Sequence, residues 1–133
     1  MARYYKGDIE GEFALGVQDS DAGERFGAVE IGHTMTYIIK DDSTTTDSLH
    51  YEVDRECYEL IVEELRLIEE SGAIKKVLKM LEEYNGWNNE IAEKCGVSRK
   101  DLKDYADYQM GIEIRDWFDD NVGIDSLHFE ADC

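Results

Sequence analysis

The chain has 133 residues, of which 42% are hydrophobic and 35% are charged, and its formal net charge at pH 7 is -18. This length suits one domain over residues 1–133, with a core that buries well over half of the unfolded chain's surface. The composition argues against intrinsic disorder, no apolar run has the length of a membrane span, and the negative charge disfavours nucleic acid and anionic lipid while favouring a basic partner.

The N-terminal segment and the cysteines favour an intracellular protein. Residues 1–13 contain no apolar stretch of the kind that a secretory signal needs. The three cysteines (Cys57, Cys95 and Cys133) are odd in number and widely spaced. Such thiols are typical of a reducing compartment and not of a disulfide framework, so we expect a cytoplasmic protein.

The first 53 residues alternate between apolar and polar side chains, which is typical of half-buried strands. We predict strands over residues 9–17, 33–40 and 48–53, with a polar hairpin loop between the last two. The apolar residues of these strands are Ile9, Phe13, Leu15, Val17, Met35, Tyr37, Ile39, Leu49, Tyr51 and Val53.

From Asp54 onward the apolar residues recur with the period of a helix. A first helix is expected to begin after Asp54 as its N-cap and to end at Gly72, and a second to end near Asn85-Gly86. A short third helix, a turn at Gly96 and a long fourth helix capped by Ser98 complete the helical part. The expected inner faces of the first two helices consist of Cys57, Leu60, Ile61, Leu65, Ile68, Ile74, Val77, Leu78 and Leu81.

The end of the chain returns to the pattern of a strand. After Gly123 the segment SLHFEAD alternates again, so it is predicted to join the first sheet. Three strands, four helices and one strand predict an α+β fold class. We expect an N-terminal antiparallel sheet of about three strands plus the C-terminal strand, with about four helices packed on one face.

The stretch EIAEKCGVSRKDLKDY, residues 90–105, has the spacing of a helix-turn-helix motif. Ala92, Gly96, Val97 and Leu102 occupy the helix crossing, the turn and the anchor positions. A DNA-binding protein would contact DNA through Ser98, Arg99, Lys100 and Lys103. However, residues 72–108 hold 7 bases and 7 acids, and we expect Asp101, Asp104 and Asp107 to face the same phosphates. A structural corner is therefore favoured, with a small transcriptional regulator as the alternative.

An acidic surface is predicted on the first helix and on the chain leading into it. Residues 1–71 hold 6 bases and 18 acids, whereas residues 109–133 hold 1 base and 7 acids. A row of carboxylates can imitate nucleic-acid phosphates and steer a basic protein onto this surface. A solubilising role is the other interpretation. The predicted partner-binding residues are Glu52, Asp54, Glu56, Glu59, Glu63, Glu64 and Glu70, of which Glu56, Glu59, Glu63 and Glu70 are expected on one exposed face.

Other site chemistry is weakly supported by the sequence. Asp19, Asp21, Gly23 and Glu30 fall at calcium-loop positions, but Glu24 stands where an EF-hand needs glycine, so a turn is favoured. The three histidines have no metal-ligand spacing to a cysteine. Glu10 and Glu12 share a predicted strand face, and we expect both carboxylates to face solvent. We therefore expect no enzyme activity, no metal and no cofactor.

Aromatic residues raise a further alternative, a pocket that sequesters a small signalling ligand. Aromatic side chains at these spacings are more often part of a core. The residues in question are Tyr4, Tyr5, Tyr37, Tyr105, Tyr108 and Trp117.

The opening segment ARYYKGDIEGEFALGVQDSDAGERFG resembles a family of small acidic proteins encoded by bacteriophages and prophages, whose N-termini read YY-x-GDIEG-x-F-x-x-GVQ-x-SD. The C-terminal segments ADYQMGIEI and HFEAD are similar to the end of that family. The resemblance implies a phage gene product acting in a bacterial cytoplasm, and it brings no assigned chemistry. The matching residues are Tyr4, Tyr5, Gly7, Asp8, Ile9, Glu10, Gly11, Phe13, Gly16, Val17, Gln18, Ser20, Asp21, Phe26 and Gly27.

Together, the charge and this resemblance favour a non-enzymatic inhibitor. We expect it to bind a basic, nucleic-acid-handling host defence protein, such as a CRISPR-Cas effector, through an acidic DNA-mimicking surface. Phages encode many small acidic proteins of this kind, anti-CRISPR proteins among them.

Overall fold

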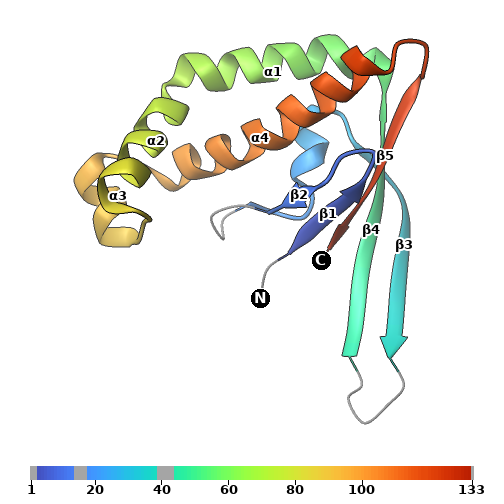
Figure 1. Ribbon diagram of the computed structural model, residues 1–133, viewed down its shortest axis with the longest axis horizontal. Helices are drawn as coiled ribbons and strands as arrows, with labels where there is room; N and C mark the ends of the chain where they lie inside the picture. The colour runs from blue at the N-terminus through green and yellow to red at the C-terminus, as the bar shows by residue number, and fades with distance from the viewer. Residues whose placement is uncertain (1–2, 14–17, 39–43, 133) are drawn as a thin grey trace.

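A computed structural model describes residues 3–13, 18–38 and 44–132, with the backbone alone for residues 34–38 and 44–47. It confirms the predicted α+β fold class, with one antiparallel sheet and helices on one side of it (Figure 1). In chain order the elements are β1 (Tyr4–Gly7), β2 (Gly11–Glu12), the 3-10 helix η1 (Ala22–Phe26), β3 (Val29–Ile38), β4 (Thr44–Asp54), the 3-10 helix η2 (Arg55–Cys57), α1 (Tyr58–Ser71), α2 (Ala73–Tyr84), α3 (Asn89–Cys95), α4 (Arg99–Asp120) and β5 (Ser126–Asp132).

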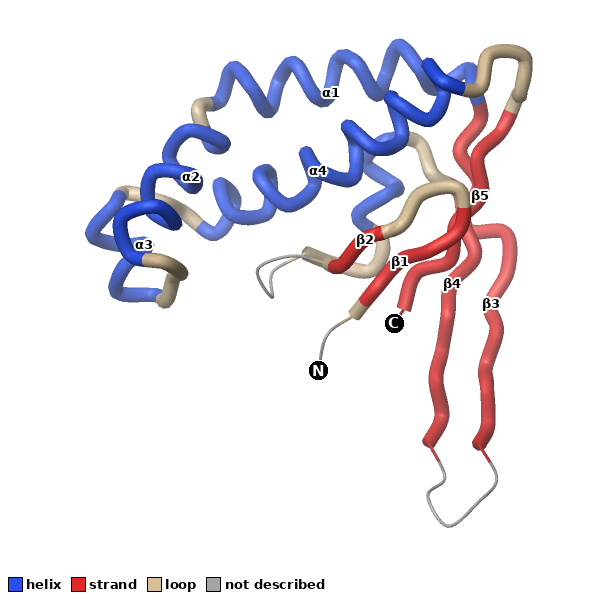
Figure 2. Tube along the Cα trace, in the orientation of Figure 1, coloured by secondary structure: helices blue, strands red, loops and turns tan. Residues whose placement is uncertain are grey.

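The sheet has the strand order β2-β1-β5-β4-β3, so the last strand of the chain lies at its centre. β5 pairs with β1 on one side and with β4 on the other, which joins the two N-terminal hairpins into one sheet. The period-two pattern turns Tyr51, Val53, Leu127 and Phe129 toward the helices, where all four are buried. The β3–β4 hairpin extends beyond the region that the helices cover (Figure 2).

Two hydrophobic clusters lie along the long helix α4. The larger cluster joins the sheet to α1 and to the second half of α4, and it includes Met110, Ile114 and Phe118. The smaller one joins α2, α3 and the start of α4 around Leu102. Gly111 lets α4 lie close to η1, because a Cβ there would be 2.6 Å from the ring of Phe26.

The ends of the first two helices follow the predicted signals, but the predicted N-cap of the first helix at Asp54 is wrong, because η2 intervenes and α1 begins at Tyr58. α1 ends at Gly72 in the left-handed region, with φ 79°, and α2 ends at Asn85, with φ 54°. Asp54 precedes η2 and makes no side-chain capping bond there. Leu60 and Leu78, predicted to face inward, are exposed instead (45% and 41%), since a helix turns about 100° per residue and each lies next to the buried position.

The predicted first strand over residues 9–17 is wrong. The chain pairs Tyr4 with Glu12 and Tyr5 with Gly11, so β1 comes earlier and β2 is very short. Gly11 is needed there because a Cβ would lie 2.6 Å from the Tyr5 hydroxyl oxygen. Ile9 and Phe13 are nevertheless buried as expected, whereas Leu15 and Val17 lie outside the described residues.

The second hairpin is longer than predicted. β3 begins at Val29, and β4 begins at Thr44 within the stretch assigned to a loop. Threonine favours strands, so the run of three threonines is compatible with pairing despite its polarity. Ile39 and residues 40–43 lie outside the described residues.

Candidate functional site

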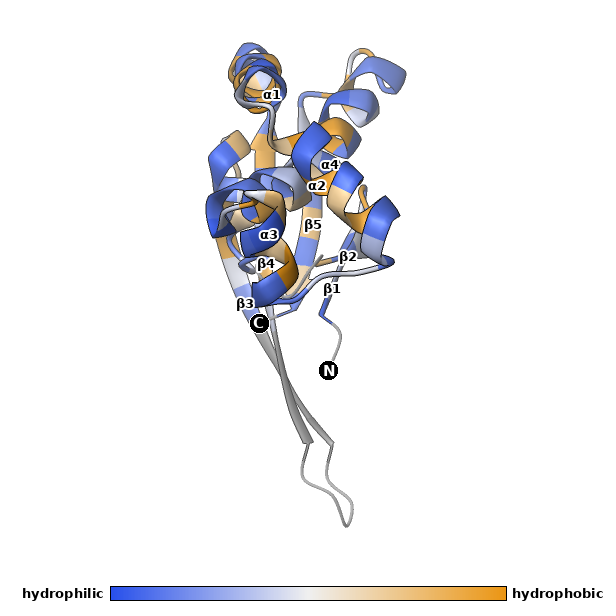
Figure 3. Cartoon of the chain, turned by 90° about the vertical axis from the view of Figure 1, so that its left-hand side faces the viewer, coloured by the Kyte–Doolittle hydropathy of each residue, from blue (hydrophilic) through white to orange (hydrophobic). Residues whose placement is uncertain are grey.

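Helix α1 presents a mostly acidic face to solvent, opposite its buried residues Ile61, Leu65 and Ile68. Figure 3 shows hydrophobic and hydrophilic residues alternating around this helix. The prediction that Glu56, Glu59, Glu63 and Glu70 share one exposed face is confirmed, with Glu56 in the preceding turn η2. We call the exposed surface the α1 acidic face, and it consists of Glu56, Glu59, Leu60, Glu63, Leu67 and Glu70.

Two leucines interrupt the carboxylates of the α1 acidic face. Leu60 is 45% exposed and Leu67 is 46% exposed. The positions 56, 60, 63, 67 and 70 follow alternating steps of four and three, so acid and leucine alternate along one stripe of the helix. Exposed leucines in isolation are common, but two of them on one acidic stripe provide apolar contact area within a charged surface.

Arg66 partly neutralises the far half of the α1 acidic face. Its Nη1 donates a hydrogen bond of 2.6 Å to Glu70, and its Nε donates one of 3.0 Å to Glu63. The hydrogen bond from Arg66 lowers the pKa of Glu63. Within the described chain, neither Glu56 nor Glu59 forms an ion pair. The uncompensated charge therefore lies at the N-terminal end of α1.

The C-terminal end of α4 adds carboxylates to this end of α1. The Tyr58 hydroxyl donates a hydrogen bond of 2.7 Å to Asp119, which ties the start of α1 to the end of α4. Asp116 and Asp120 are exposed in the same last turns of α4. These residues were missed individually, although the net charge of -6 in residues 109–133 signalled them.

Negative charge at a helix C-terminus opposes the helix dipole, and Arg55 offsets this at α4. Its guanidinium donates to the carbonyls of Asn121 at 2.7 Å, Ile124 at 2.8 Å and Phe118 at 3.2 Å. A shallow hollow of about 530 Å³ lies between the two helix ends. Acidic and apolar side chains line it together with one arginine. The lining residues are Arg55, Glu56, Tyr58, Glu59, Phe118, Asp119 and Val122.

Three of the seven predicted partner-binding residues lie away from the α1 acidic face. Glu52 is on the outer face of the sheet, 3.8 Å from His128, and Asp54 is exposed at the end of β4. Glu64 turns toward η1 and forms an ion pair of 3.1 Å with Arg25. These three acids do not share the face of Glu56, Glu59, Glu63 and Glu70, since strand alternation and helix rotation send neighbouring acids in different directions.

Arg25 is held by two buried carboxylates of α4. Its Nη1 lies 2.8 Å from Asp104 and 3.2 Å from Asp107, whose side chains are 5% and 2% exposed. Burial raises the pKa of Asp107, while its hydrogen bond from Arg25 acts in the opposite direction. The expectation that Asp104 and Asp107 would face phosphate is wrong, because both point into the protein.

The helix-turn-helix-like corner is present as a packed unit. Ala92, Val97 and Leu102 are buried in the smaller hydrophobic cluster, and Gly96 adopts φ 69° at the turn. Ser98 and Asp101 form a reciprocal capping box at the start of α4.

The cationic side chains of that corner are largely paired with acids. Lys103 forms an ion pair of 2.8 Å with Asp19, and Lys100 one of 3.0 Å with Asp104. The Lys103 hydrogen bond lowers the pKa of Asp19. Arg99 is exposed and has no ion pair among the residues described. The corner thus offers less positive charge to a phosphate than its sequence suggests.

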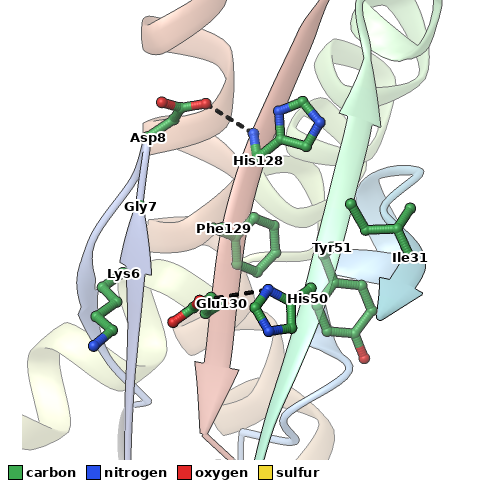
Figure 4. A pocket seen from close by; sticks show the side chains of 9 residues that line it. All are labelled: Lys6, Gly7, Asp8, Ile31, His50, Tyr51, His128, Phe129 and Glu130. Carbon is green, nitrogen blue, oxygen red and sulfur yellow. Dashed lines mark hydrogen bonds and ion pairs between the residues drawn. The ribbon is translucent and has the colours of Figure 1, made fainter. Parts of the chain in front are cut away.

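The outer face of the sheet carries a shallow hollow of about 510 Å³ that the sequence did not indicate (Figure 4). His50, His128 and Glu130 are among its lining residues. Two cross-strand pairs lie on this face: His50 is 3.4 Å from Glu130, and His128 is 3.8 Å from Glu52. The His128 amide also donates to Asp8 at 2.8 Å. Strand alternation places His50 and His128 on this outer face, since their neighbours Tyr51 and Phe129 are buried. Such alternating pairs stabilise a solvated sheet face.

The less favoured alternatives, a calcium loop and an aromatic pocket, do not assemble either. In place of a calcium loop, Ala22–Phe26 form η1 and Gly23 is buried, and the described part of the chain contains no group of three or more residues that could hold a metal ion. The aromatic side chains also separate. Tyr5, Tyr108 and Trp117 belong to or pack against the larger hydrophobic cluster, as parts of the core. Tyr105 packs against the smaller cluster, Tyr4 is 52% exposed, and the side chain of Tyr37 lies outside the described residues.

Comparisons with protein-family models, curated proteins and solved structures found no match to this chain. The described helices include none with the length and hydropathy needed to cross a bilayer. The α+β fold and the α1 acidic face are therefore the observations from which a function must be argued.

Proposed function

We propose that this protein is a phage-type, non-enzymatic inhibitor that acts in the bacterial cytoplasm. It binds a basic, nucleic-acid-handling host defence protein, such as a CRISPR-Cas effector, through the α1 acidic face. The supporting observation is the stripe on which Leu60 and Leu67 stand exposed between carboxylates. Binding there occludes the partner's nucleic-acid channel by charge and by bulk.

The carboxylates act in recognition and association. The axial distance from Glu56 to Glu70 corresponds to about 21 Å of helix, a span over which duplex DNA also presents phosphates to a protein. The acids at the end of α4 raise the charge density where Arg66 does not compensate it. A cationic channel is attracted to such a surface from a distance, which increases the association rate.

The two leucines distinguish a binding surface from a merely solubilising one. Carboxylates alone would serve solubility better, since exposed apolar area promotes association. At the centre of an interface, burial of a leucine contributes about 1.5–3 kcal/mol, whereas rim charges mainly affect the association rate. The mixed stripe therefore supports a protein partner.

The experiment is an affinity pull-down from a bacterial host, read by mass spectrometry, followed by binding measurements with the captured protein. The triple variant Glu56→Lys, Glu59→Lys, Glu63→Lys is expected to lose binding while its circular dichroism stays unchanged. The matched control is Glu82→Lys, Glu83→Lys, Glu90→Lys, which makes the same charge change at exposed sites on α2 and α3. Equal loss in both variants, or retained binding in the first, contradicts a specific α1 interface.

A second variant separates contact from long-range attraction. Leu60→Ala with Leu67→Ala leaves the net charge unchanged, so steering is preserved while buried contact is lost. We expect faster dissociation and a nearly unchanged association rate. An unchanged dissociation rate would mean that the leucines are outside the interface.

The alternative function is a small transcriptional regulator that uses the helix-turn-helix-like corner. The observation in its favour is the exposed Arg99 at the start of α4, next to Lys100 and Lys103. A gel shift with cognate phage DNA at low salt tests it. Salt-sensitive binding that is lost in Arg99→Ala with Lys103→Ala supports the regulator, and absence of binding at low salt excludes it.

A further inference from the structure

The outer edge of β3 has no strand partner within the described sheet. β3 pairs with β4 on one side, and it is the last strand in the order β2-β1-β5-β4-β3. The register is irregular between Glu30 and Gly32 and then runs without a break from Gly32 to Ile38. Figure 1 shows this edge at the border of the molecule, away from α1.

Beyond the irregularity at Glu30, the edge from Gly32 to Ile38 lacks the features that usually prevent strands from pairing. Proteins commonly protect a sheet edge with charged residues, especially lysine, or with proline. Residues 31–39, IGHTMTYII, contain no Asp, Glu, Lys or Arg, although 35% of the chain is charged, and the chain has no proline at all. No other uncharged run in the sequence is as long. Val29 and Ile31 at the start of the strand are 63% and 53% exposed.

We propose that the free edge of β3 pairs with β3 of a second copy of the chain. The two strands run antiparallel across a two-fold axis, so that the two sheets become one continuous sheet. A two-fold contact brings the same surface from both copies together. Because residues 32–38 carry no formal charge with histidine neutral, this contact opposes no like charges over that segment.

Charge also identifies a second copy as the occupant in preference to a basic partner. Two copies of a chain with net charge -18 repel one another over most of their surfaces, and the uncharged edge is where that repulsion is weakest. A basic protein is attracted to the carboxylates of α1 and gains nothing electrostatic at β3. The two surfaces therefore have different partners, and this inference is independent of the proposed inhibitor function.

The hairpin itself benefits from such pairing. β5 pairs with β4 from Ser48 to Asp54, so Thr44 to Asp47 have β3 as their only neighbour in the described sheet. A two-stranded ribbon is marginally stable in water. Addition of β3 and β4 from a second copy makes this extension four strands wide.

Sedimentation equilibrium of the full chain, at several protein concentrations and two salt concentrations, tests the proposal. We expect a monomer–dimer equilibrium. It shifts toward the dimer when the salt concentration is raised to roughly 0.5 M, because screening weakens the repulsion between copies. A complex formed by the α1 acidic face with a basic protein has the opposite dependence, weakening with salt. The sign of the salt effect therefore separates the two proposals.

The variant Thr36→Glu places a negative charge from each copy at the proposed seam and is expected to raise the dimer dissociation constant roughly tenfold or more. The matched control is Thr46→Glu, at the position that pairs with Thr36 within the hairpin. It alters the hairpin similarly but not the outer edge of β3. Backbone amides of Val29–Ile38 should also exchange more slowly as concentration rises.

A monomer at all concentrations and both salts overturns the proposal. So does a dimer that Thr36→Glu leaves intact, or one that both glutamate variants weaken equally, since the seam would then lie elsewhere. Circular dichroism of both variants shows whether the sheet is retained, and the exchange measurement on the unmodified chain does not depend on either variant folding.

Discussion

The Arg25 guanidinium in η1 donates a hydrogen bond of 2.8 Å to the buried carboxylate of Asp104 in α4, 79 positions later in the chain. It also reaches Asp107 and Glu64, so one side chain joins η1 to both α1 and α4. Loss of one member of a buried ion pair leaves the other uncompensated, and that is more costly than the pair is stabilising.

Arg25→Met is therefore expected to lower the free energy of unfolding by about 2–4 kcal/mol, below the upper end for buried pairs because Arg25 is 28% exposed. Arg66→Met is the control: Arg66 also pairs with two carboxylates, but in solvent, where such pairs contribute little. Urea denaturation measures both. A similar, small effect of the two substitutions would show that the Arg25 cluster behaves as a surface pair.

Glu113 accepts a hydrogen bond from the buried Tyr5 hydroxyl. Burial raises the pKa of Glu113, and the charge of Glu10 adds to this, while the bond from Tyr5 opposes it. The folded protein thus holds the Glu113 proton to higher pH than the unfolded chain does. Above the unfolded pKa of about 4.3, the wild type should lose stability relative to Glu113→Gln as pH rises through the folded pKa.

Denaturation of wild type and Glu113→Gln between about pH 4 and pH 8 measures this difference. Subtraction of one curve from the other removes the contribution of the other carboxylates. A difference that is constant with pH, or one that grows in favour of the wild type, would contradict the raised pKa.

Gly111 allows α4 to pack directly on η1 and α1. A Cβ there would lie 2.6 Å from Phe26 and 2.7 Å from Leu65. Gly111→Ala should cost about 1–3 kcal/mol through overpacking, although alanine favours a helix by up to about 1 kcal/mol. Gly32→Ala is the control, because its Cβ would meet His50 at an ordinary 3.7 Å. Thermal unfolding should show a lower melting temperature for the first variant alone.

Ser98 accepts a hydrogen bond from the Asp101 amide at 3.1 Å and caps α4. Ser98→Ala should lower stability by about 1 kcal/mol. The control is Asn89→Ala at an exposed position, which is expected to change the free energy of unfolding by no more than about 0.5 kcal/mol. Chemical denaturation measures both, and an undiminished stability of Ser98→Ala would mean that the capping box contributes nothing.

Periodicity predicted the elements that a single repeating pattern dominates. The helical ends at Gly72 and Asn85, the corner at Gly96 and the strand after Gly123 all follow local signals, and all are confirmed. The first strand failed because its length depends on a contact: Gly11 passes over the Tyr5 hydroxyl, and β1 pairs with β5 from the other end of the chain.

The candidate site shows the same division. Helical spacing was sufficient to place Glu56, Glu59, Glu63 and Glu70 on one face of α1. It could not show that Asp119 joins them through Tyr58, or that Glu64 turns to Arg25, because these contacts join segments 39 or more positions apart. Asp104 is buried and paired with Arg25, whereas Asp116 is exposed, although both lie on α4. This difference likewise depends on what packs against each turn of the helix.

The sequence by itself determined the α+β class, the local helix and turn boundaries and the excess of negative charge, since these depend on composition and on short-range periodicity. Only the tertiary structure decided which carboxylates remain available, because burial and ion pairing are long-range. It also decided that β5 occupies the centre of the sheet and leaves β3 at its edge, since strand order depends on which distant segments pair.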